Sequence, residues 1–188
     1  MLTGFKDRDN VITQTIYKDP VTNIADPFNR PRLVKAALGV SAVENHTAIY
    51  YAPMTTPFGI TLTNNDVLTA KDQTNLDDAT LRSWTHTDGF GRTVQSTTRD
   101  PQGDDEVVTI YDALSRVKQV SNPFRPSQGE SAVYTTTNYD FAGRMISVTT
   151  PDNAAVSIYY SGNQVLVKDQ AGKERMSQTN ALGQLKDV

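Results

Sequence analysis

The chain has 188 residues, a formal net charge of −3 at neutral pH and no cysteine. The weakly acidic balance argues against nucleic acid or an anionic membrane surface as a partner, because both attract clustered positive charge. The lack of cysteine excludes disulfide bonds and thiolate metal sites. No run approaches the roughly 20 apolar residues of a membrane-spanning helix, and the first residues lack the apolar core of a signal peptide. The length suits one domain or a segment of a larger protein.

Residues 1–59 are the less regular part of the chain, and we predict a mixed β and loop region there. Strands are expected at 11–17 and 46–52, where β-branched and aromatic residues gather. The run from Asp26 to Pro31 is predicted to be a loop, because its two prolines cannot join a regular strand ladder. Residues 32–39 resemble a helix, with a strand as the alternative, because eight residues make a marginal helix.

From residue 60 to residue 188 the sequence predicts a strip of β-strands. Turn signals recur about every 8–12 residues, which is typical of all-β structure. No long helical pattern interrupts them, so a parallel α/β sheet is disfavoured. We expect strands at 60–63, 66–70, 79–87, 92–98, 104–111, 116–121, 131–139, 144–150, 154–160, 164–168, 173–179 and 184–188.

A short motif recurs four times in this strip. Its best copies are Tyr111–Val117 and Tyr139–Met145, in which Tyr-Asp is followed by two residues, then glycine or serine, then arginine. The copies around Asp88 and Asn180 lack the tyrosine, and the last one also has glutamine in place of arginine. The residues that carry the motif are Asp88, Gly91, Arg92, Tyr111, Asp112, Arg116, Tyr139, Asp140, Gly143, Arg144, Asn180 and Gly183.

Each copy is expected to close a β-hairpin. An Asp or Asn side chain accepts a backbone N–H two residues later, and glycine takes a positive φ at little cost. β-prone residues flank the motif, so each copy predicts strand, tight turn and strand. The arginine is expected to reach back to its own carboxylate, as Arg116 to Asp112 and Arg144 to Asp140. The predicted fold is therefore all-β, a series of antiparallel β-hairpins that form a curved strip.

Two patterns qualify this picture. The interval from Asp140 to Asn180 is 40 residues (180 − 140), longer than the others, so it should hold extra strands, and a closed propeller is disfavoured. Val117 and Val120 are three residues apart, so in an unbroken strand they would face opposite sides of the sheet. Either both faces are partly covered by a larger assembly, or a β-bulge intervenes.

These residues resemble the YD-repeat, or RHS-repeat, family. The resemblance rests on the motif copies and on the segments Ser121–Phe124, Thr150–Asp152, Tyr160–Asn163 and Asp169–Lys173, and it covers roughly residues 60–188. It implies a strip of hairpins that spirals into a hollow β-shell, which in complete members encapsulates a toxin for bacterial competition. The Asp-Pro-x-Gly-Leu segment that closes the shell in complete members is absent from this sequence. The resemblance therefore implies a shell segment without the C-terminal toxin part.

Histidine and acidic residues give little sign of a catalytic or metal site. His86 stands two residues from Asp88, and His46 is far from both in the sequence, so we interpret both histidines as solvent-facing or turn-adjacent. Asp100 and its acidic neighbours around Gly103 do not match the twelve-residue calcium loop, and we expect a solvated hairpin tip. Neither a phosphate loop nor an activated nucleophile stands out. We predict no enzyme activity and no cofactor.

The aromatic residues allow two interpretations. Cross-strand aromatic pairs stabilise sheets by a few tenths to about 1 kcal/mol each, and tyrosines recur at hairpin ends as such packing requires. The alternative is a cell-surface module in which an aromatic hairpin face binds carbohydrate by stacking on sugar rings. The residues expected to form that face are Trp84, Tyr134, Tyr159 and Tyr160.

The sequence therefore predicts a non-enzymatic scaffold, a segment of an RHS-type shell. Each hairpin needs its neighbours to bury apolar surface, so the expected partners are other repeat segments or further copies of this chain at an unpaired strand edge. An enclosed toxin and a polysaccharide are further expected partners, whereas nucleic acid and a membrane span are not. The family resemblance implies a secreted or cell-surface location as part of a larger protein.

Overall fold

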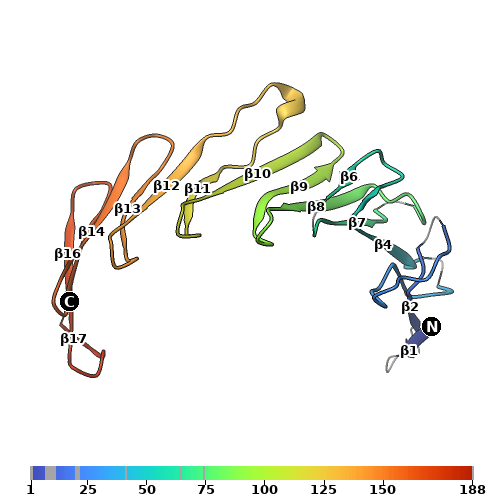
Figure 1. Cartoon of the computed structure of the whole chain (residues 1–188), viewed down its shortest axis with the longest axis horizontal. Coiled ribbons are helices and arrows are strands. Elements are labelled where there is room, and N and C mark those ends of the chain that lie inside the picture. The colour runs from blue at the N-terminus through green and yellow to red at the C-terminus, as the bar shows by residue number, and fades with distance from the viewer. Residues whose placement is uncertain are drawn as a thin grey trace. The chain divides into compact units, whose positions relative to one another are not determined.

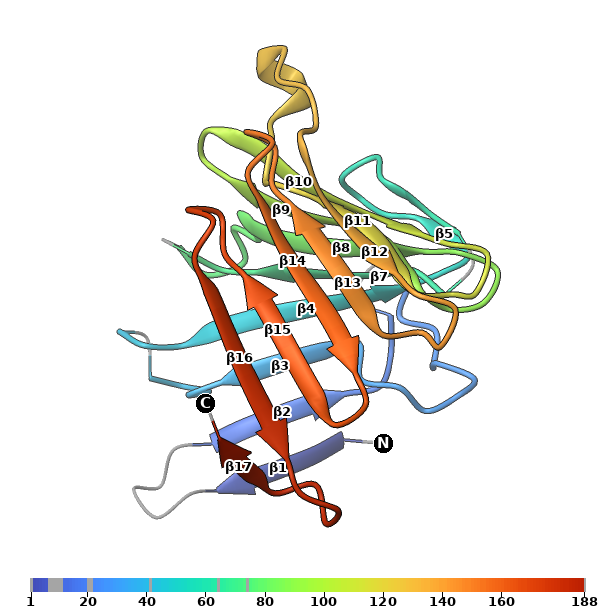
Figure 2. The ribbon, with the colours of Figure 1, turned by 90° about the vertical axis from the view of Figure 1, so that its left-hand side faces the viewer.

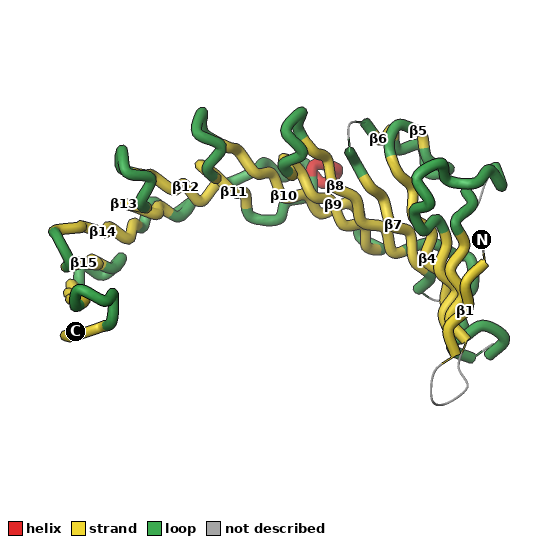
Figure 3. The backbone as a smooth tube through the Cα atoms, turned by 60° about the horizontal axis from the view of Figure 1, so that its bottom comes forward, coloured by secondary structure: helices red, strands yellow, loops and turns green. Residues whose placement is uncertain are grey.

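A computed structural model describes residues 2–6, 12–19, 22–40, 42–63, 65–73 and 75–187. These residues form strands, loops and one short 3-10 helix, η1 (Pro126–Gln128), as Figure 3 shows. Within the described ranges, no helix has the length and hydrophobicity to cross a membrane. The all-β prediction is confirmed. The first residue of the predicted strand at 11–17 and the last residue of the one at 184–188 lie outside the described residues.

Fifteen strands pair in the order β1-β2-β3-β4-β7-β8-β9-β10-β11-β12-β13-β14-β15-β16-β17, and β5 and β6 form a separate ribbon (Figure 1). The bounds are β1 (Leu2–Lys6), β2 (Ile12–Ile16), β3 (Leu33–Ala36), β4 (Asn45–Tyr51), β5 (Met54–Thr55), β6 (Thr61–Leu62), β7 (Val67–Lys71), β8 (Leu81–Thr87), β9 (Thr93–Asp100), β10 (Gly103–Tyr111), β11 (Val117–Ser121), β12 (Tyr134–Tyr139), β13 (Met145–Thr149), β14 (Ala155–Ser161), β15 (Gln164–Lys168), β16 (Glu174–Thr179) and β17 (Leu185–Asp187). The strands of this series pair antiparallel with their sequence neighbours, except that β4 pairs with β7 across the β5–β6 ribbon, so the predicted serial hairpins are confirmed. The sheet is not closed, since β1 and β17 are the ends of the described order.

The strands expected after residue 60 are all present, and the largest boundary difference is at β12, which begins at Tyr134 instead of residue 131. The helix-like run at 32–39 is a strand, β3, so the helical interpretation is wrong and its alternative holds. The reason is tertiary, because β3 pairs with β2 on one side and with β4 on the other. Eight residues of helix propensity cannot compete with two strand ladders.

The chain divides into two compact units. Unit 1 comprises Met1–Val107 with Phe124–Glu130, and unit 2 comprises Val108–Pro123 with Ser131–Val188. This division rests on the contacts between residues in the structure. The boundary that the sequence predicts between residues 1–59 and 60–188 rests on the regularity of the turns, and it stays a prediction.

Unit 1 contains a hydrophobic core. Leu68 on β7 has no exposed surface, and it packs with Tyr50 and Trp84 from the two neighbouring strands and with Leu62 from the β5–β6 ribbon. The ring of Phe58, in the connection between β5 and β6, meets Tyr50 edge-on at 5.9 Å between centroids. The ribbon thus covers one face of β4, β7 and β8, where alternate side chains point inward.

Unit 2 is a single layer of antiparallel strands, and Figure 2 shows β13, β14, β15 and β16 side by side in it. Its described residues include no buried apolar side chain. A β-bulge interrupts the register between Ile110 and Tyr111, where Tyr111 pairs with Val117 and Thr109 pairs with Val120. Because paired residues share a face and Thr109 and Tyr111 lie two apart, the bulge places Val117 and Val120 on the same face.

The same bulge recurs before Tyr139, which pairs with Met145. One face of unit 2, the apolar face, therefore carries Val117, Val120, Met145, Val148, Val156, Ile158, Val165 and Val167. The opposite face is mixed: it carries Gln119, Thr136 and Asn138, and also Ile110, Leu166 and Met176. Of the two readings of the valine spacing, the β-bulge is the one that the structure shows.

Candidate functional site

Asp112 organises the turn between β10 and β11. One of its carboxylate oxygens, Oδ1, accepts the backbone N–H groups of Leu114 and Arg116, each at 2.9 Å. The N–H of Ser115 donates to the Asp112 carbonyl at 3.0 Å and closes a type I turn, and the N–H of Asp112 donates to the Arg116 carbonyl at 2.9 Å. This is a three-residue hairpin loop with a left-handed third residue, the loop that produces the neighbouring bulge.

The same hydrogen bonds recur in the other three copies of the motif. Asp88, Asp140 and Asn180 each accept the N–H four residues later, at 3.0, 2.9 and 3.0 Å. The left-handed position has φ of 77° at Gly91, 82° at Gly143 and 75° at Gly183, and 64° at Ser115. The predicted turn chemistry is confirmed, including the positive φ, which serine adopts only at a cost.

The arginine of each turn binds the carboxylate of the same turn, as predicted. Arg116 Nε lies 2.7 Å from Asp112 Oδ2, and Arg144 Nε lies 2.8 Å from Asp140 Oδ2. Arg92 pairs with Asp88 in the same way, at 2.7 Å from Nε to Oδ2 and 2.6 Å from Nη2. Hydrogen bonds from the side chain of Arg92 lower the pKa of Asp88. Those from the backbone and then the side chain of the following arginine lower the pKa of Asp112 and Asp140.

Tyr139 links this turn to the next hairpin. The guanidinium carbon of Arg116 lies 4.4 Å from the centre of the Tyr139 ring, and the Tyr139 hydroxyl donates to the carbonyl of Val117 at 2.8 Å. Arg116 Nη1 also donates to the carbonyl of Asp140 at 3.4 Å. Arg116 therefore contacts its own turn and the following one. We call Asp112, Arg116 and Tyr139 the first Asp–Arg–Tyr cluster.

A second Asp–Arg–Tyr cluster consists of Asp140, Arg144 and Tyr160. The guanidinium carbon of Arg144 lies 4.3 Å from the Tyr160 ring centre, and the Tyr160 hydroxyl donates to the carbonyl of Met145 at 3.0 Å. The geometry repeats that of the first cluster, although Tyr160 is followed by serine and not by aspartate. The sequence analysis placed Tyr160 on a sugar-stacking face and missed this role. It recognised a tyrosine of the motif by the aspartate that follows it, and Tyr160 has no such aspartate.

The turns of unit 2 alternate between the two ends of its strands, because each antiparallel strand reverses the chain. The turns at Asp112 and Asp140 lie at the same strand ends as those at Gly162 and Asn180, and the turn at Asp169 lies at the opposite strand ends. The long interval before Asn180 thus holds an additional hairpin, as expected. The turn at Gly162 lacks both Asp and Arg, but the sequence analysis includes it among the turns of the repeat series, and the structure places a turn there.

The aromatic residues do not form one continuous sugar-stacking face. Trp84 is 8% exposed in the core of unit 1, so its assignment to such a face is wrong. Its neighbours on β4 and β7 are apolar, and burial of the indole is more favourable than exposure. Tyr134 is half-buried, Tyr159 is 55% exposed, and Tyr160 is engaged in its cluster. Tyr159 and Tyr160 are consecutive and point to opposite faces.

His86 lies beside the β8–β9 turn, as one of the two expectations for the histidines had it, and neither histidine is fully exposed to solvent. His46 is 5% exposed, with Nδ1 at 2.6 Å from Asp77 Oδ1 and Nε2 at 3.0 Å from Glu44 Oε1. His86 is half-buried, and its Nδ1 lies 2.7 Å from a carboxylate oxygen of Asp66, not from Asp88. Hydrogen bonds to Asp66 outweigh the effect of its burial and lower its pKa. The partners Asp66 and Asp77 lie on loops that are distant in the sequence from His86 and His46, so no local sequence pattern indicated these contacts.

The acidic cluster at the β9–β10 turn is not a solvated tip. Arg125, from the loop between β11 and β12, binds Asp105 and Asp100, each at 2.7 Å, within unit 1. These bonds raise the pKa of Arg125, first through Asp105, and the Arg125 contact contributes to the lowered pKa of Asp100. Burial, followed by the charge of Asp104, raises the pKa of Glu106. Arg125 thus pairs with two of the acidic residues and Arg99 pairs with a third, Asp104, and the sequence pattern around Gly103 carried no sign of the Arg125 contact.

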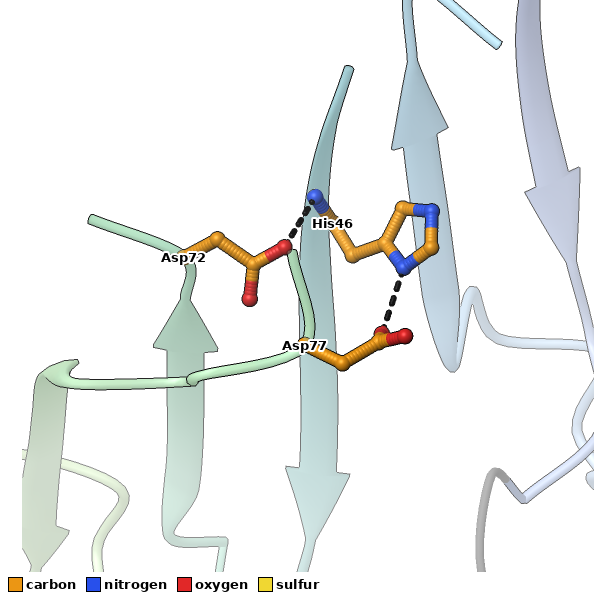
Figure 4. Close-up of side chains that lie close together, drawn as sticks. All are labelled: His46, Asp72 and Asp77. Atoms are coloured by element: carbon orange, nitrogen blue, oxygen red, sulfur yellow. Dashed lines mark hydrogen bonds and ion pairs between the residues drawn. The ribbon is translucent and has the colours of Figure 1, made fainter. Parts of the chain in front are cut away.

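One group of side chains has the composition of a metal site. The potential ligand atoms of His46, Asp72 and Asp77 all lie within 4.8 Å of one another, and Figure 4 shows the three side chains together. They line a cavity of about 320 Å³ whose other walls include Tyr50 and Phe58. His46 and Asp72 are buried, and Asp77 is exposed.

Comparison with solved structures places the fold beside known proteins. The chain is similar to the structure titled "Crystal Structure of TcdB2-TccC3", with a TM-score of 0.60 and 14% sequence identity. The similarity covers 97% of this chain and 13% of that one, so this chain spans a small part of the protein that it matches. No protein-family model matches the sequence, and no curated protein matches it. At this identity, the similarity shows the fold.

Proposed function

We propose that this protein is a non-enzymatic scaffold, a segment of an RHS-type shell that encloses a toxin in the complete protein. The observation that carries the proposal is the repeated Asp–Arg–Tyr cluster, in which each arginine bonds to its own turn and stacks on a tyrosine of the next hairpin. Such nearest-neighbour contacts let a sheet grow by addition of hairpins. The similarity in fold to the TcdB2-TccC3 structure and the resemblance to YD repeats support the same assignment.

The two faces of unit 2 support an enclosing role. The apolar face carries the valines, Met145 and Ile158, and no described part of unit 2 covers it. An apolar sheet face needs a partner, because apolar surface left in water gains none of the stabilisation of burial. In this proposal the apolar face lines the interior of the shell, further repeat hairpins pair at the sheet edges, and the complete protein acts at the cell surface or after secretion.

Cysteine labelling tests which face of unit 2 is covered, and the cysteine-free chain makes it direct. Val120 and Ile110 are 37% and 38% exposed, and their strand pairings place them on opposite faces. In the isolated chain, V120C and I110C should react with a maleimide at similar rates. In the longest natural form of the protein, V120C should react at least about tenfold more slowly than I110C, because only the apolar face turns inward. Equal rates for the two faces in that form would reject an enclosing shell.

A carbohydrate-binding module is the second candidate, and one observation favours it. Tyr159 lines a cavity of about 380 Å³ together with Arg144, Asp140 and Ser157, which combines an exposed ring with polar groups as sugar binding requires. Titration of tyrosine fluorescence with polysaccharides should then give saturable binding that Tyr159→Ala abolishes. The half-buried Tyr134 provides the control, since Tyr134→Phe should leave binding unchanged. Absence of saturable binding across a glycan array would remove this candidate.

A further inference from the structure

His46, Asp72 and Asp77 come from separate segments of unit 1. His46 lies on β4, Asp72 directly follows β7, and Asp77 lies in the connection from β7 to β8. The backbone N–H of His46 donates to Asp72 Oδ2 at 2.9 Å, and the His46 Nδ1 faces Asp77 Oδ1 at 2.6 Å (Figure 4). The pairing of β4 with β7 thus brings one imidazole nitrogen and two carboxylates to the same place.

The charges at this place are unbalanced. Three carboxylates, those of Glu44, Asp72 and Asp77, surround a single imidazole, and Lys35 is the basic side chain that acts on Glu44. Among the partners that the structure describes for the Asp72 carboxylate there is no cation. Its oxygens accept backbone N–H groups of His46 and Ala79, at 2.9 and 3.2 Å. A carboxylate that is 5% exposed is costly to bury without a positive partner.

Glu44 provides a second observation. Its Oε1 lies 3.0 Å from His46 Nε2. A histidine that binds a metal almost always donates its other ring N–H to a carboxylate, a carbonyl or water, which fixes the tautomer and orients the ring. With a proton on Nε2 and Glu44 as its acceptor, the Nδ1 lone pair becomes available to a metal once the proton of the 2.6 Å contact between Nδ1 and Asp77 Oδ1 has left. This is the tautomer that a metal at that nitrogen needs.

We propose that His46 Nδ1 and the carboxylates of Asp72 and Asp77 bind a divalent transition-metal ion, with Zn²⁺ as the expected occupant. One imidazole nitrogen and two carboxylate oxygens suit zinc, whereas calcium takes six to eight oxygen ligands. The cavity of about 320 Å³ leaves room for water as a further ligand. Binding releases any proton shared between Nδ1 and Asp77 to solvent, and the largely exposed Asp77 side chain is free to adjust to the ion.

The consequence of binding is structural. The ion joins the β7–β8 connection, through Asp77, to β4, through His46, and it supplies the positive charge that Asp72 lacks. It therefore stabilises unit 1, and this effect does not depend on whether the protein forms a shell. A metal that binds only the native state stabilises it by RT ln(1 + [M]/Kd), so the unfolding temperature rises with the logarithm of the metal concentration once that concentration exceeds Kd.

The test is calorimetric titration of the chelator-treated full chain with ZnCl₂, together with its thermal unfolding. We expect one Zn²⁺ per chain, a raised unfolding temperature and no comparable binding of CaCl₂. D77N alters an exposed side chain and should fold, and it should weaken Zn²⁺ binding at least about tenfold; H46Q should abolish the binding.

Glu174→Gln is the matched control, because Glu174 is an exposed carboxylate of unit 2 far from the cluster in sequence, and it should bind like the unaltered chain. The proposal is overturned if the unaltered chain gives no zinc binding, if D77N binds as tightly as the unaltered chain, or if calcium binds as tightly as zinc. In the first case, His46 serves only to join Glu44 and Asp77 through its two ring nitrogens.

Discussion

Removal of the Tyr139 hydroxyl tests whether the first Asp–Arg–Tyr cluster couples neighbouring hairpins. The hydroxyl donates to the Val117 carbonyl at 2.8 Å, in a place that water reaches. A hydrogen bond contributes about 0.5–1.5 kcal/mol net, and exposure puts this one at the low end, so Tyr139→Phe should cost about 0.5 kcal/mol. Tyr139→Ala also removes the contact with Arg116, which contributes about 0.5–1 kcal/mol at an exposed site. The alanine variant should therefore cost about 1–2 kcal/mol with its lost packing.

A double-mutant cycle isolates the contact between hairpins. Arg116→Gln loses its bonds to Asp112 as well as the ring contact, so single variants overstate the contact. The cycle of Arg116→Gln with Tyr139→Ala cancels the Asp112 contribution, and the remaining coupling should be about 0.5–1 kcal/mol. Urea unfolding followed by far-ultraviolet circular dichroism measures the free energies, and hydrogen exchange of β11 and β12 locates the loss in unit 2.

Two further variants make the result interpretable. Tyr160→Phe removes the equivalent hydroxyl in the second cluster and should cost as much as Tyr139→Phe. Tyr134→Phe changes a half-buried tyrosine on the same strand as Tyr139 and should stay within about 0.5 kcal/mol of the unaltered chain. A coupling between Arg116 and Tyr139 of less than about 0.3 kcal/mol would show that the stacked geometry carries no energy between hairpins.

Three other predictions concern stability. Leu68→Ala should destabilise unit 1 by about 2–5 kcal/mol, because its side chain has no exposed surface, and the fluorescence of Trp84 during urea unfolding measures the loss. Ser115→Gly should stabilise unit 2 by up to about 1 kcal/mol, since φ at this position is 64°, and urea unfolding followed by far-ultraviolet circular dichroism measures the gain. The ionised carboxylates of Asp112 and Asp140 should stabilise unit 2 fully above the ordinary carboxyl pKa of about 4, and this stabilisation should be lost as pH falls through their lowered pKa values. Urea midpoints measured against pH test this, and a drop that begins at neutral pH would contradict it.

The turns and strands could be predicted because their determinants are local. The carboxylate of Asp112 and the backbone groups that it binds lie within four residues, and the left-handed position requires only glycine or a tolerated serine. The β-prone runs between turns are long enough to fix the strands. The Arg116–Asp112 pair follows from the same short loop, so residue types and spacing sufficed for it.

The partners of the buried polar groups could not be predicted, because they come from distant segments. His46 meets Asp77 from 31 residues away, and Arg125 meets Asp105 from 20 residues away. These contacts depend on which strands pair and on the length and path of the loops. Trp84 was misassigned for a similar reason, since the β5–β6 ribbon that helps to cover it carries only two-residue strands.

The β-bulge shows how one local rule controls a property of the whole sheet. A loop that closes with a left-handed residue adds one residue to the outgoing strand, so Val117 and Val120, three apart, share a face. The same loop holds Arg116 against Asp112 and directs it toward Tyr139. One turn therefore sets both the contact to the next hairpin and the sidedness of the apolar face. A residue that resists a positive φ at this position would therefore disturb both together.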